Sequence, residues 1–518
     1  MRNRGNNGPA PSQDLLNRPT SLWLMIAWVT AIYWPVTFVL ATRKQFWNDE
    51  LATYYISALD TFPRIWSTLL TAVDQNPPLF YWLTHRVTEA TGQNLIGLRL
   101  PAMFGYWLAA VCMMAFVSRH LPTVYGLLAA LILLVSRAYW YSYEARPYGV
   151  VLGLAALALL CWQRSDGPRK LGWSVGLASA LGIAVSWHYF SVLLFVPLAI
   201  GEAYRSWVKK QWNWPVWLAF AAAASCLLPY LPLIQSARSY SGTFWSKPRF
   251  DALIGFVMFF VSPALLALVA AALLWVVFGN KKTARTLAEA PGRWGFPAFE
   301  LVPMLGMFFI VPLAIIMGKL VTGAYTHRYV ISGVLALSFL LVWMLASAFE
   351  ARRAPANVLA VLFSCAFLLR MVPGVGATNG ISGYDHSGVI RALEQGVPND
   401  LPIAVADPLL FFELVHQSPP KLRSRLFYVA EPKIAIRRVG TDTIERALIG
   451  MQTIASLRVK TLASVMNSRE NFLIIGYPAV SLDWLVEELT SLRVPMSVVG
   501  SLGQGLILLA EPGHEEPR

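Results

Sequence analysis

The chain has 518 residues, of which 56% are hydrophobic and only 14% are charged, and its mean hydropathy is +0.52. This composition is too apolar for a soluble globular protein of that length, so it predicts a polytopic membrane protein. The formal net charge of +14 does not indicate nucleic-acid binding, because the Lys and Arg residues lie mostly in short connectors between apolar runs. The four cysteines lie in or beside apolar runs without CxxC spacing, so neither a disulfide nor a zinc site is expected.

Residues 1–20 are rich in Asn, Gly and Pro and predict a disordered cytoplasmic tail. The apolar run that follows is too long for the core of a signal peptide, so we interpret it as a retained first span. A span requires about 20 apolar residues, and eleven runs are candidates. They centre near Ala31, Trp107, Leu131, Leu154, Ala180, Val196, Phe220, Ala267, Ile310, Leu337 and Phe363.

The positions of the cations predict how these spans are oriented. With the N-terminus in the cytoplasm, the short cytoplasmic connectors are the ones rich in Lys and Arg, as the positive-inside rule requires. The outer side then receives the loops near residues 42–97, 141–148, 236–251 and 318–328, followed by the C-terminal part. The connector cations are Arg119, Arg164, Arg169, Lys170, Arg205, Lys209, Lys210, Lys281, Lys282, Arg285, Arg293, Arg352 and Arg353.

From residue 374 to residue 518 the composition changes to that of a water-soluble domain. Short apolar runs alternate there with helical patterns such as the one at 481–492, which predicts a small α/β layer fold. The predicted fold class is therefore an α-helical polytopic membrane domain at residues 21–373, with about 11 transmembrane helices, followed by a C-terminal soluble α/β domain. The expected strands lie at 401–406, 425–429, 471–476, 495–499 and 505–509.

Two adjacent carboxylates, Asp49 and Glu50, stand at the start of the long first outer loop. A carboxylate near hydrocarbon is costly unless it has a partner or a function. The structural alternative is that both acids stabilise the first turn of a short helix that lies along the membrane surface and includes residues 51–56.

Two further outer segments, 143–148 and 325–329, bring acids, arginines and tyrosines to the same side of the membrane. The structural alternatives are an interfacial ion pair between the acid and the arginine of the first segment, and a snorkelling arginine in the second. A lipid rim alone would not require three segments to converge in this way, so the pattern favours a shared site. The residues are Glu144, Arg146 and Tyr148 in the first segment, and Tyr325, Arg328 and Tyr329 in the second.

Five short motifs lie near the outer ends of the spans: WNDE at 47–50, DQNPPLFY at 74–81, LRLP at 98–101, EARPY at 144–148 and HRY at 327–329. Together they resemble the bacterial branch of the dolichyl-phosphate-mannose protein mannosyltransferase family, which includes the aminoarabinose transferases of lipid A. The resemblance extends to about residue 373 and implies an integral-membrane glycosyltransferase of the GT-C fold. One position departs from the family, because relatives often have His before the Pro-Pro pair where this chain has Asn76.

The resemblance implies that a sugar is transferred, with inversion, from a polyprenyl (undecaprenyl) phosphate donor to a lipid, protein or glycan acceptor. It also implies a bacterial cytoplasmic (inner) membrane, with the reaction on its outer face and membrane lipids as the other partners. The phosphate leaving group departs as an anion, so it needs positive charge more than a proton. Arg146 and Arg328 suit this role, with Tyr325 or Tyr329 as neutral donors. The resemblance favours Asp49 as the general base, while Glu50 orients it or holds a neighbouring cation.

Asp74, Asn76 and His188 are weaker candidates, which we assign to an acceptor path. The alternatives are that the first two cap the turn set by the Pro-Pro pair and that His188 is a hydrogen-bonded interfacial residue. No cofactor is expected, and a divalent cation is not indicated because no dedicated set of ligands stands out in the sequence.

Two other functions remain open at this point. A transporter or flippase places ionisable groups near the bilayer midplane and often contains internal repeats, neither of which this sequence shows. A catalytically silent member of the family, whose outer domain binds an envelope partner, is the other alternative. The presence of all three outer segments favours the enzyme over both.

Overall fold

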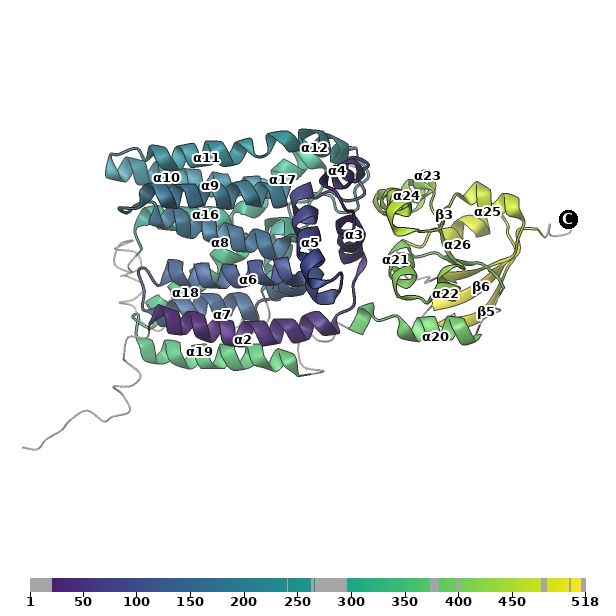
Figure 1. Cartoon of the computed structure of the whole chain (residues 1–518), viewed down its shortest axis with the longest axis horizontal. Coiled ribbons are helices and arrows are strands. Elements are labelled where there is room, and N and C mark those ends of the chain that lie inside the picture. Colours follow the sequence, from purple (N-terminus) through teal and green to yellow (C-terminus); the bar gives the residue numbers. More distant parts are fainter. Residues whose placement is uncertain are drawn as a thin grey trace, which may run out of the picture.

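The helices of the apolar part of the chain run side by side as a bundle, and a sheet-containing part lies at one end of that bundle (Figure 1). The computed structural model describes residues 21–239, 241–261, 265, 296–372, 382–396, 400–476, 482–502 and 505–513. Four features expected from the sequence lie outside these residues: the tail at 1–20, the span centred near Ala267, the boundary at 373–374, and the connector cations Lys281, Lys282, Arg285 and Arg293.

Each of the other ten predicted span centres lies in a helix of the bundle. Four of the described helices are long and apolar enough to cross a membrane, or up to six if each of two bent pairs is one span. The count of eleven spans therefore stays a prediction. The bundle helices are α2 (Leu22–Arg43), α6 (Leu95–Val117), α7 (Thr123–Val135), α8 (Tyr148–Arg164), α9 (Lys170–Trp187), α10 (Phe195–Lys209), α11 (Trp214–Ser225), α16 (Ala298–Phe308), α17 (Ile310–Met317), α18 (Gly333–Ala348) and α19 (Arg353–Leu368).

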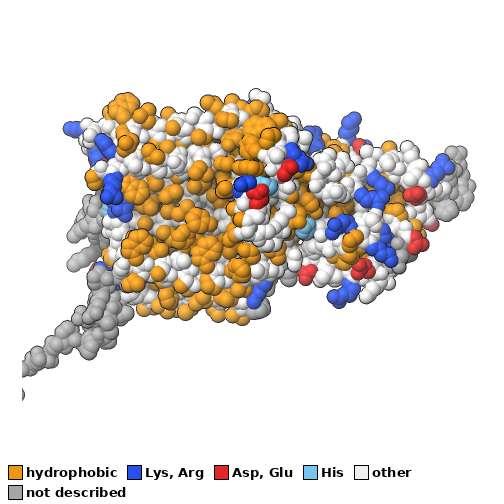
Figure 2. All heavy atoms as spheres, in the orientation of Figure 1, with side chains coloured by type: hydrophobic (Ala, Val, Ile, Leu, Met, Phe, Trp, Pro, Cys, Tyr) orange, Lys and Arg blue, Asp and Glu red, His pale blue; other side chains and the backbone are white. Residues whose placement is uncertain are grey.

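The surface of the bundle is that of a membrane protein. Figure 2 shows hydrophobic side chains over most of its visible face, while charged side chains gather toward its ends and on the sheet-containing part. Large apolar residues such as Trp23 on α2 and Val361 on α19 are exposed. Exposed apolar area of this extent is stable only when lipid rather than water covers it.

Small residues allow two central helices to approach closely. A Cβ added to Gly153 of α8 would lie 2.2 Å from the backbone oxygen of Gly105 on α6, so only glycine fits at this crossing. The crossing fixes α8, and with it the segment at 144–147 that immediately precedes this helix.

Shorter elements lie at the end of the bundle that faces the sheet, where Figure 1 places α3, α4, α5 and α12. The short helices there are α3 (Asn48–Ser57), α4 (Phe62–Leu70), α5 (Pro78–Thr91), α12 (Leu231–Arg238) and α13 (Ala252–Phe260). Short 3-10 helices and one π-helix, η5, complete the helical part, namely η1 (Arg137–Tyr143), η2 (Tyr189–Leu194), η3 (Leu228–Tyr230), η5 (Gly318–Thr322), η6 (His327–Val330) and η7 (Leu369–Met371).

The sheet contains six strands in the order β3-β2-β1-β4-β6-β5. The first four in this order pair in parallel, with Ile403 opposite both Leu426 and Leu473, whereas β6 is antiparallel to β4 and β5. Strands β1, β2 and β4 consist entirely of buried residues, as expected for central strands covered on both faces. The strands are β1 (Ile403–Val405), β2 (Leu426–Val429), β3 (Val459–Lys460), β4 (Phe472–Gly476), β5 (Met496–Leu502) and β6 (Gly505–Ala510).

Each of the five runs expected as strands overlaps one of these strands, although β5 and β6 extend beyond the expected ends, and the two-residue strand β3 was not expected. The helical pattern at 481–492 contains α26. The helices of this part are η9 (Ser382–Tyr384), α20 (Ser387–Gly396), α21 (Pro408–Gln417), α22 (Pro420–Arg423), α23 (Pro432–Val439), α24 (Thr443–Ala455), α25 (Leu462–Ser468) and α26 (Leu485–Ser491).

Candidate active site

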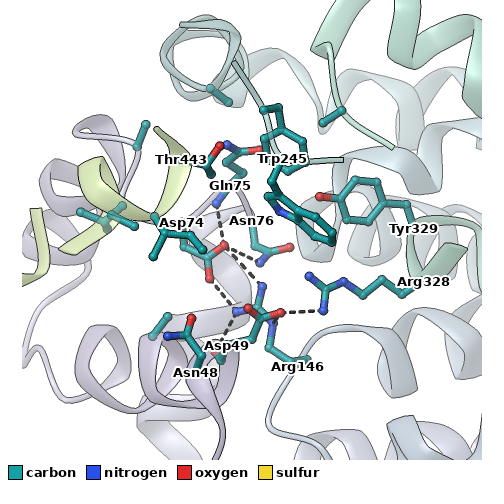
Figure 3. Close-up of a pocket in the computed structure, with 18 of the residues that line it drawn as sticks. Asn48, Asp49, Asp74, Gln75, Asn76, Arg146, Trp245, Arg328, Tyr329 and Thr443 are labelled. Carbon is teal, nitrogen blue, oxygen red and sulfur yellow. Dashed lines mark hydrogen bonds and ion pairs between the residues drawn. The ribbon is translucent and has the colours of Figure 1, made fainter. Parts of the chain in front are cut away.

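Three segments at one end of the bundle meet at one cluster of charged side chains (Figure 3). The Asp49 carboxylate lies 2.6 Å from Nη1 of Arg328 and 3.9 Å from Nε of Arg146. On its other side, Arg146 donates to Oδ2 of Asp74 at 2.6 Å. The sequence therefore predicted correctly that residues 49, 146 and 328 lie together.

Each of these side chains is placed by the start of a helix or turn. Asp49 lies in the first turn of α3, and Asp74 lies in the turn before the Pro-Pro pair at which α5 begins. Arg146 lies just before α8, and Arg328 lies in η6. These elements begin at the same end of the bundle, so their polar first residues meet there. The more apolar residues that follow pack into the helical part.

Arg146 also holds the backbone of α3 in place. Its Nη1 donates to the backbone oxygen of Asp49 at 3.1 Å. Burial alone would raise the pKa of Asp74, but the Arg146 guanidinium outweighs burial and holds the pKa of this carboxyl below its ordinary value. Asp74 also accepts from Nδ2 of Asn76 at 3.1 Å, so the turn-capping interpretation of these two residues holds alongside their place at the cluster.

The cluster borders a cavity of about 550 Å³ between the helical part and the sheet-containing part. Its bundle side carries the charged cluster, together with the predicted residues Asn76, Tyr148, His188 and Tyr329. Its opposite side is mostly apolar and is formed by residues of α21 and α24 and their neighbours, including Leu409, Phe412, Ile444, Leu448 and Met451. We call this space the roofed cavity.

A second cavity, of about 890 Å³, adjoins the first, and we call it the cationic cavity. Trp47, Trp245 and Arg328 line both cavities, so these three side chains stand at the boundary between them. Aromatic side chains such as Trp140, Tyr141 and Phe259 line much of the cationic cavity. Its other cations are Arg137, Lys247, Arg249 and Arg370, and the predicted residues Glu144 and Tyr325 line it as well.

Glu50 lines neither cavity. It is fully buried and pairs with Nζ of Lys44 at 2.7 Å and with Nε of Arg99 at 2.7 Å. It also accepts from the backbone N–H of Ala145 at 2.7 Å. Burial opposes ionisation, but Arg99 and Lys44 outweigh it and lower the pKa of Glu50 to about 2. The expectation that Glu50 holds a neighbouring cation agrees with this geometry, whereas contact with a substrate does not.

Glu144 does not pair with Arg146, so the structural alternative of an ion pair between these two residues is wrong. Its carboxylate lies 3.5 Å from Nζ of Lys44 and accepts from Nε1 of Trp140. The partner of Arg146 is instead Asp74, seventy-two positions earlier in the chain. The two residues therefore belong to different cavities, although only one position separates them.

The predicted tyrosines and His188 also divide between the two spaces. Tyr148 and Tyr329 stand on the roofed cavity, where the ring of His188 lies 5.0 Å from that of Tyr329, between ring centroids. Tyr325 faces the cationic cavity beside His327. The tyrosines are thus available to different parts of a substrate that spans both cavities.

Several polar residues on the cavities were not predicted as site residues, among them Trp47, Asn48, Gln75 and Trp245. Trp47 and Asn48 precede the predicted acid, and their side-chain nitrogens are buried without a hydrogen-bond partner among the described residues. Gln75 follows Asp74, and Trp245 lies in the outer loop at 236–251. The first three belong to motifs already noted, so their position in those motifs was an available signal. No sequence pattern pointed to Trp245.

The described residues offer no ready metal site. Among them, no group of three or more His, Cys, Asp or Glu side chains is placed to hold a metal ion. The positive charge near Asp49 comes from two guanidinium groups instead.

Residues 75–232 match the family model of the dolichyl-phosphate-mannose-protein mannosyltransferases. Among solved structures, the chain is similar to ArnT from Cupriavidus metallidurans in the apo state, with 14% identity, a TM-score of 0.56, and coverage of 94% of this chain and 97% of that one. It is also similar to the same protein bound to undecaprenyl phosphate, with 14% identity, a TM-score of 0.50, and coverage of 94% and 98%. No curated protein matches the sequence significantly.

Proposed function

We infer that the chain is an inverting membrane glycosyltransferase. The GT-C fold and the match of one segment to the dolichyl-phosphate-mannose-protein mannosyltransferase model support this inference. The enzyme transfers a sugar from a polyprenyl phosphate to an acceptor hydroxyl at the outer face of a bacterial cytoplasmic membrane. One observation carries this proposal: a carboxylate and two guanidinium groups from distant segments meet where two cavities adjoin. A base and a phosphate-binding cation are the two groups that this reaction needs.

The cationic cavity suits the donor. Its aromatic walls fit a prenyl chain, and its arginines and lysine fit a phosphate, whose oxygens a guanidinium binds in a fork geometry. The similar ArnT structure is one bound to undecaprenyl phosphate, which supports a donor of this class. Arg328 is the cation shared with the roofed cavity, so we assign it to the phosphate oxygen that carries the developing charge.

The roofed cavity suits the acceptor. An acceptor hydroxyl near Asp49 gives its proton to the carboxylate while its oxygen attacks the anomeric carbon of the donor. The bond from that carbon to the phosphate oxygen breaks, and its electron pair stays on the phosphate beside Arg328. Attack from the face opposite the phosphate inverts the anomeric carbon. Arg146 and Asp74 hold Asp49 and its helix in place and contact the acceptor side.

The orientation of the chain in the membrane places the proposed site. With the N-terminus in the cytoplasm, the cavities and the sheet-containing domain lie on the outer side of the membrane. The acceptor is a lipid, a protein or a glycan, and the transferred sugar is a hexose or a pentose. A transporter or flippase is not favoured, because the charged cluster lies at helix ends rather than within the bundle and the fold is that of ArnT.

The proposal is tested with the purified chain in lipid vesicles that contain a panel of polyprenyl-phosphate sugars and an envelope extract as acceptor. Mass spectrometry should detect a product that carries the sugar with an inverted anomeric centre. Asp49→Asn keeps the shape of the side chain but removes the base, so transfer should fall by about 10²–10⁴-fold. Full transfer by this variant would remove Asp49 as the base, and sugar-lipid movement without any transfer would favour the flippase.

A further inference from the structure

The sheet-containing part contacts the helix that carries Asp49. Helix α21 packs against α3, where the ring of Phe412 stacks on that of Tyr55 with centroids 5.6 Å apart and an interplanar angle of 23°. The ring of His416 lies 4.9 Å from that of Tyr54, and Nδ1 of His416 lies 3.2 Å from the Tyr55 hydroxyl. These contacts fix the C-terminal half of α3 but leave its first turn to be held by other groups.

The first turn of α3 has no cap from its own segment. The residue before the helix, Trp47, makes no capping hydrogen bond with its side chain. The first N–H groups of a helix require outside partners, and a negative charge is favourable beside them. Glu413 of α21 supplies both, because its Oε1 accepts from the backbone N–H of Asn48 at 3.0 Å. Asn48 is the first residue of α3, and Asp49 is the second.

The Glu413 carboxylate is itself held from the other side. Its Oε2 pairs with Nε2 of His386 at 2.6 Å. The backbone N–H of His386 donates to Oε1 of Gln417 at 3.0 Å, and Nε2 of Gln417 donates to the backbone oxygen of Tyr384 at 2.8 Å. Glu413 is only 6% exposed. The Glu413 carboxylate is therefore restrained from the side opposite α3, and it serves as a fixed hydrogen-bond acceptor for the first turn of that helix.

We propose that Glu413 is a positioning residue for the transfer reaction, which fixes the first turn of α3 and thereby places the Asp49 carboxylate at the boundary of the two cavities. The C-terminal domain then helps to place the active-site carboxylate and also forms a wall of the acceptor cavity. This inference rests on the proposed function. A misplacement of about 1 Å in a reacting group is enough to lower a rate by up to about 10²-fold, so the effect is measurable.

The first test compares Glu413→Gln with Glu413→Leu in the full-length chain. The amide keeps an oxygen acceptor for the Asn48 N–H, whereas leucine fills the space without one. Glu413→Leu should lower kcat by about 10–100-fold and change KM for the donor by less than about twofold. Glu413→Gln should keep at least about half of wild-type kcat. Glu394→Leu, on the exposed surface of α20, is the matched control and should match wild type.

The second test removes the donor instead of the acceptor. Proline is well accommodated at the first position of a helix and lacks an N–H, and the extended backbone of Trp47 permits it. Asn48→Pro should therefore lower kcat well below that of Asn48→Ala, which keeps the N–H. In a Glu413→Leu background the two Asn48 variants should have equal kcat, because the hydrogen bond is already absent. The comparison of the two Asn48 variants in the wild-type background decides the proposal even if Glu413→Leu folds poorly.

Hydrogen exchange provides a readout that does not require transfer. The amides of residues 48–52 should exchange faster in Glu413→Leu and at the wild-type rate in Glu413→Gln. An unchanged kcat in folded Glu413→Leu, or equal loss in both Glu413 variants with unchanged exchange, overturns the proposal. A wild-type chain that transfers no sugar overturns the proposed function instead, and the exchange experiment still shows whether Glu413 holds α3.

Discussion

Asp49 and Glu50 are neighbours in the chain, yet they belong to two charged clusters of different character. The Glu50 cluster, with Lys44 and Arg99, has side chains that are all 0% exposed. In the Asp49 cluster the side chains of Asp49, Asp74 and Arg328 remain 23%, 12% and 16% exposed. The distances in the two clusters are similar, so distance alone does not separate them. Access to a cavity distinguishes the Asp49 cluster from the Glu50 cluster.

The geometry of a helix explains this division. Successive residues point about 100° apart around a helix axis, so two adjacent acids on α3 face different surroundings. Glu50 points toward α2, α6 and the segment before α8, where it joins buried cations and a backbone N–H. Asp49 points toward the cavities. We therefore propose a structural role for the Glu50 cluster and a chemical role for the Asp49 cluster.

The strongest test of this comparison is Arg328→Gln. It removes the cation shared by the two cavities while keeping a side chain that can donate a hydrogen bond. Loss of a group that stabilises charge in the transition state typically lowers kcat by about 10²–10³-fold, which we expect here. The melting temperature of the solubilised protein should change little. A variant that retains wild-type kcat would show that the cluster at Asp49 is also structural.

Glu50→Gln should have the opposite profile. Removing one charge from a fully buried group of ions leaves Lys44 and Arg99 without their main partner, which typically costs about 3–5 kcal/mol in unfolding free energy. The fraction that remains folded should transfer sugar at a rate within about twofold of wild type. Denaturation monitored by circular dichroism, together with activity per folded molecule, checks both expectations. A stable but inactive variant would erase the distinction between the two clusters.

The pH dependence of stability in Asp74→Asn tests the ion pair between Asp74 and Arg146, which lies at the edge of the Asp49 cluster. The pKa of Asp74 is lowered below its ordinary value of 3.8, so its ion pair with Arg146 adds stability above that value and loses it as pH falls through the folded pKa. Wild type should therefore melt at a higher temperature than the variant near neutral pH, and the difference should shrink in acid. Asp60→Asn, which breaks an exposed pair with Arg64, is the control and should show almost no difference at any pH. A difference that grows in acid would contradict the assignment.

The smallest effect on kcat is expected at the contact between the C-terminal domain and the turn that contains Asp74. A Cβ added to Gly450 of α24 would lie 2.2 Å from Cγ1 of Val73, so Gly450→Ala requires that side chain to move. Because Val73 can shift its rotamer, kcat should fall only about two- to fivefold. Gly388→Ala on α20 meets nothing within 4 Å and should leave kcat unchanged. Equal kcat in the two variants would show that the turn is insensitive to the domain above it.

The sequence by itself determined most of the elements and the end of the bundle at which the charged side chains meet. Apolar runs long enough to span a membrane specify their helices locally, and the placement of Asp49, Arg146 and Arg328 near helix ends follows from their positions relative to those runs. The short motifs were enough to indicate the resemblance to the dolichyl-phosphate-mannose-protein mannosyltransferases, whose family model matches residues 75–232. They did so because backbone turns and charged groups at a shared site are local features of sequence.

Only the tertiary structure decided which charges pair and what covers them. Arg146 pairs with Asp74 rather than with Glu144, and Glu50 turns into a buried cluster, because pairing depends on how α3, α8 and the turn before α5 pack together. The apolar roof and Trp245 come from parts of the chain far from Asp49, and the contact of Glu413 with Asn48 joins residues 365 positions apart. Contacts of this kind depend on the relative placement of whole elements, which no local pattern of residues encodes.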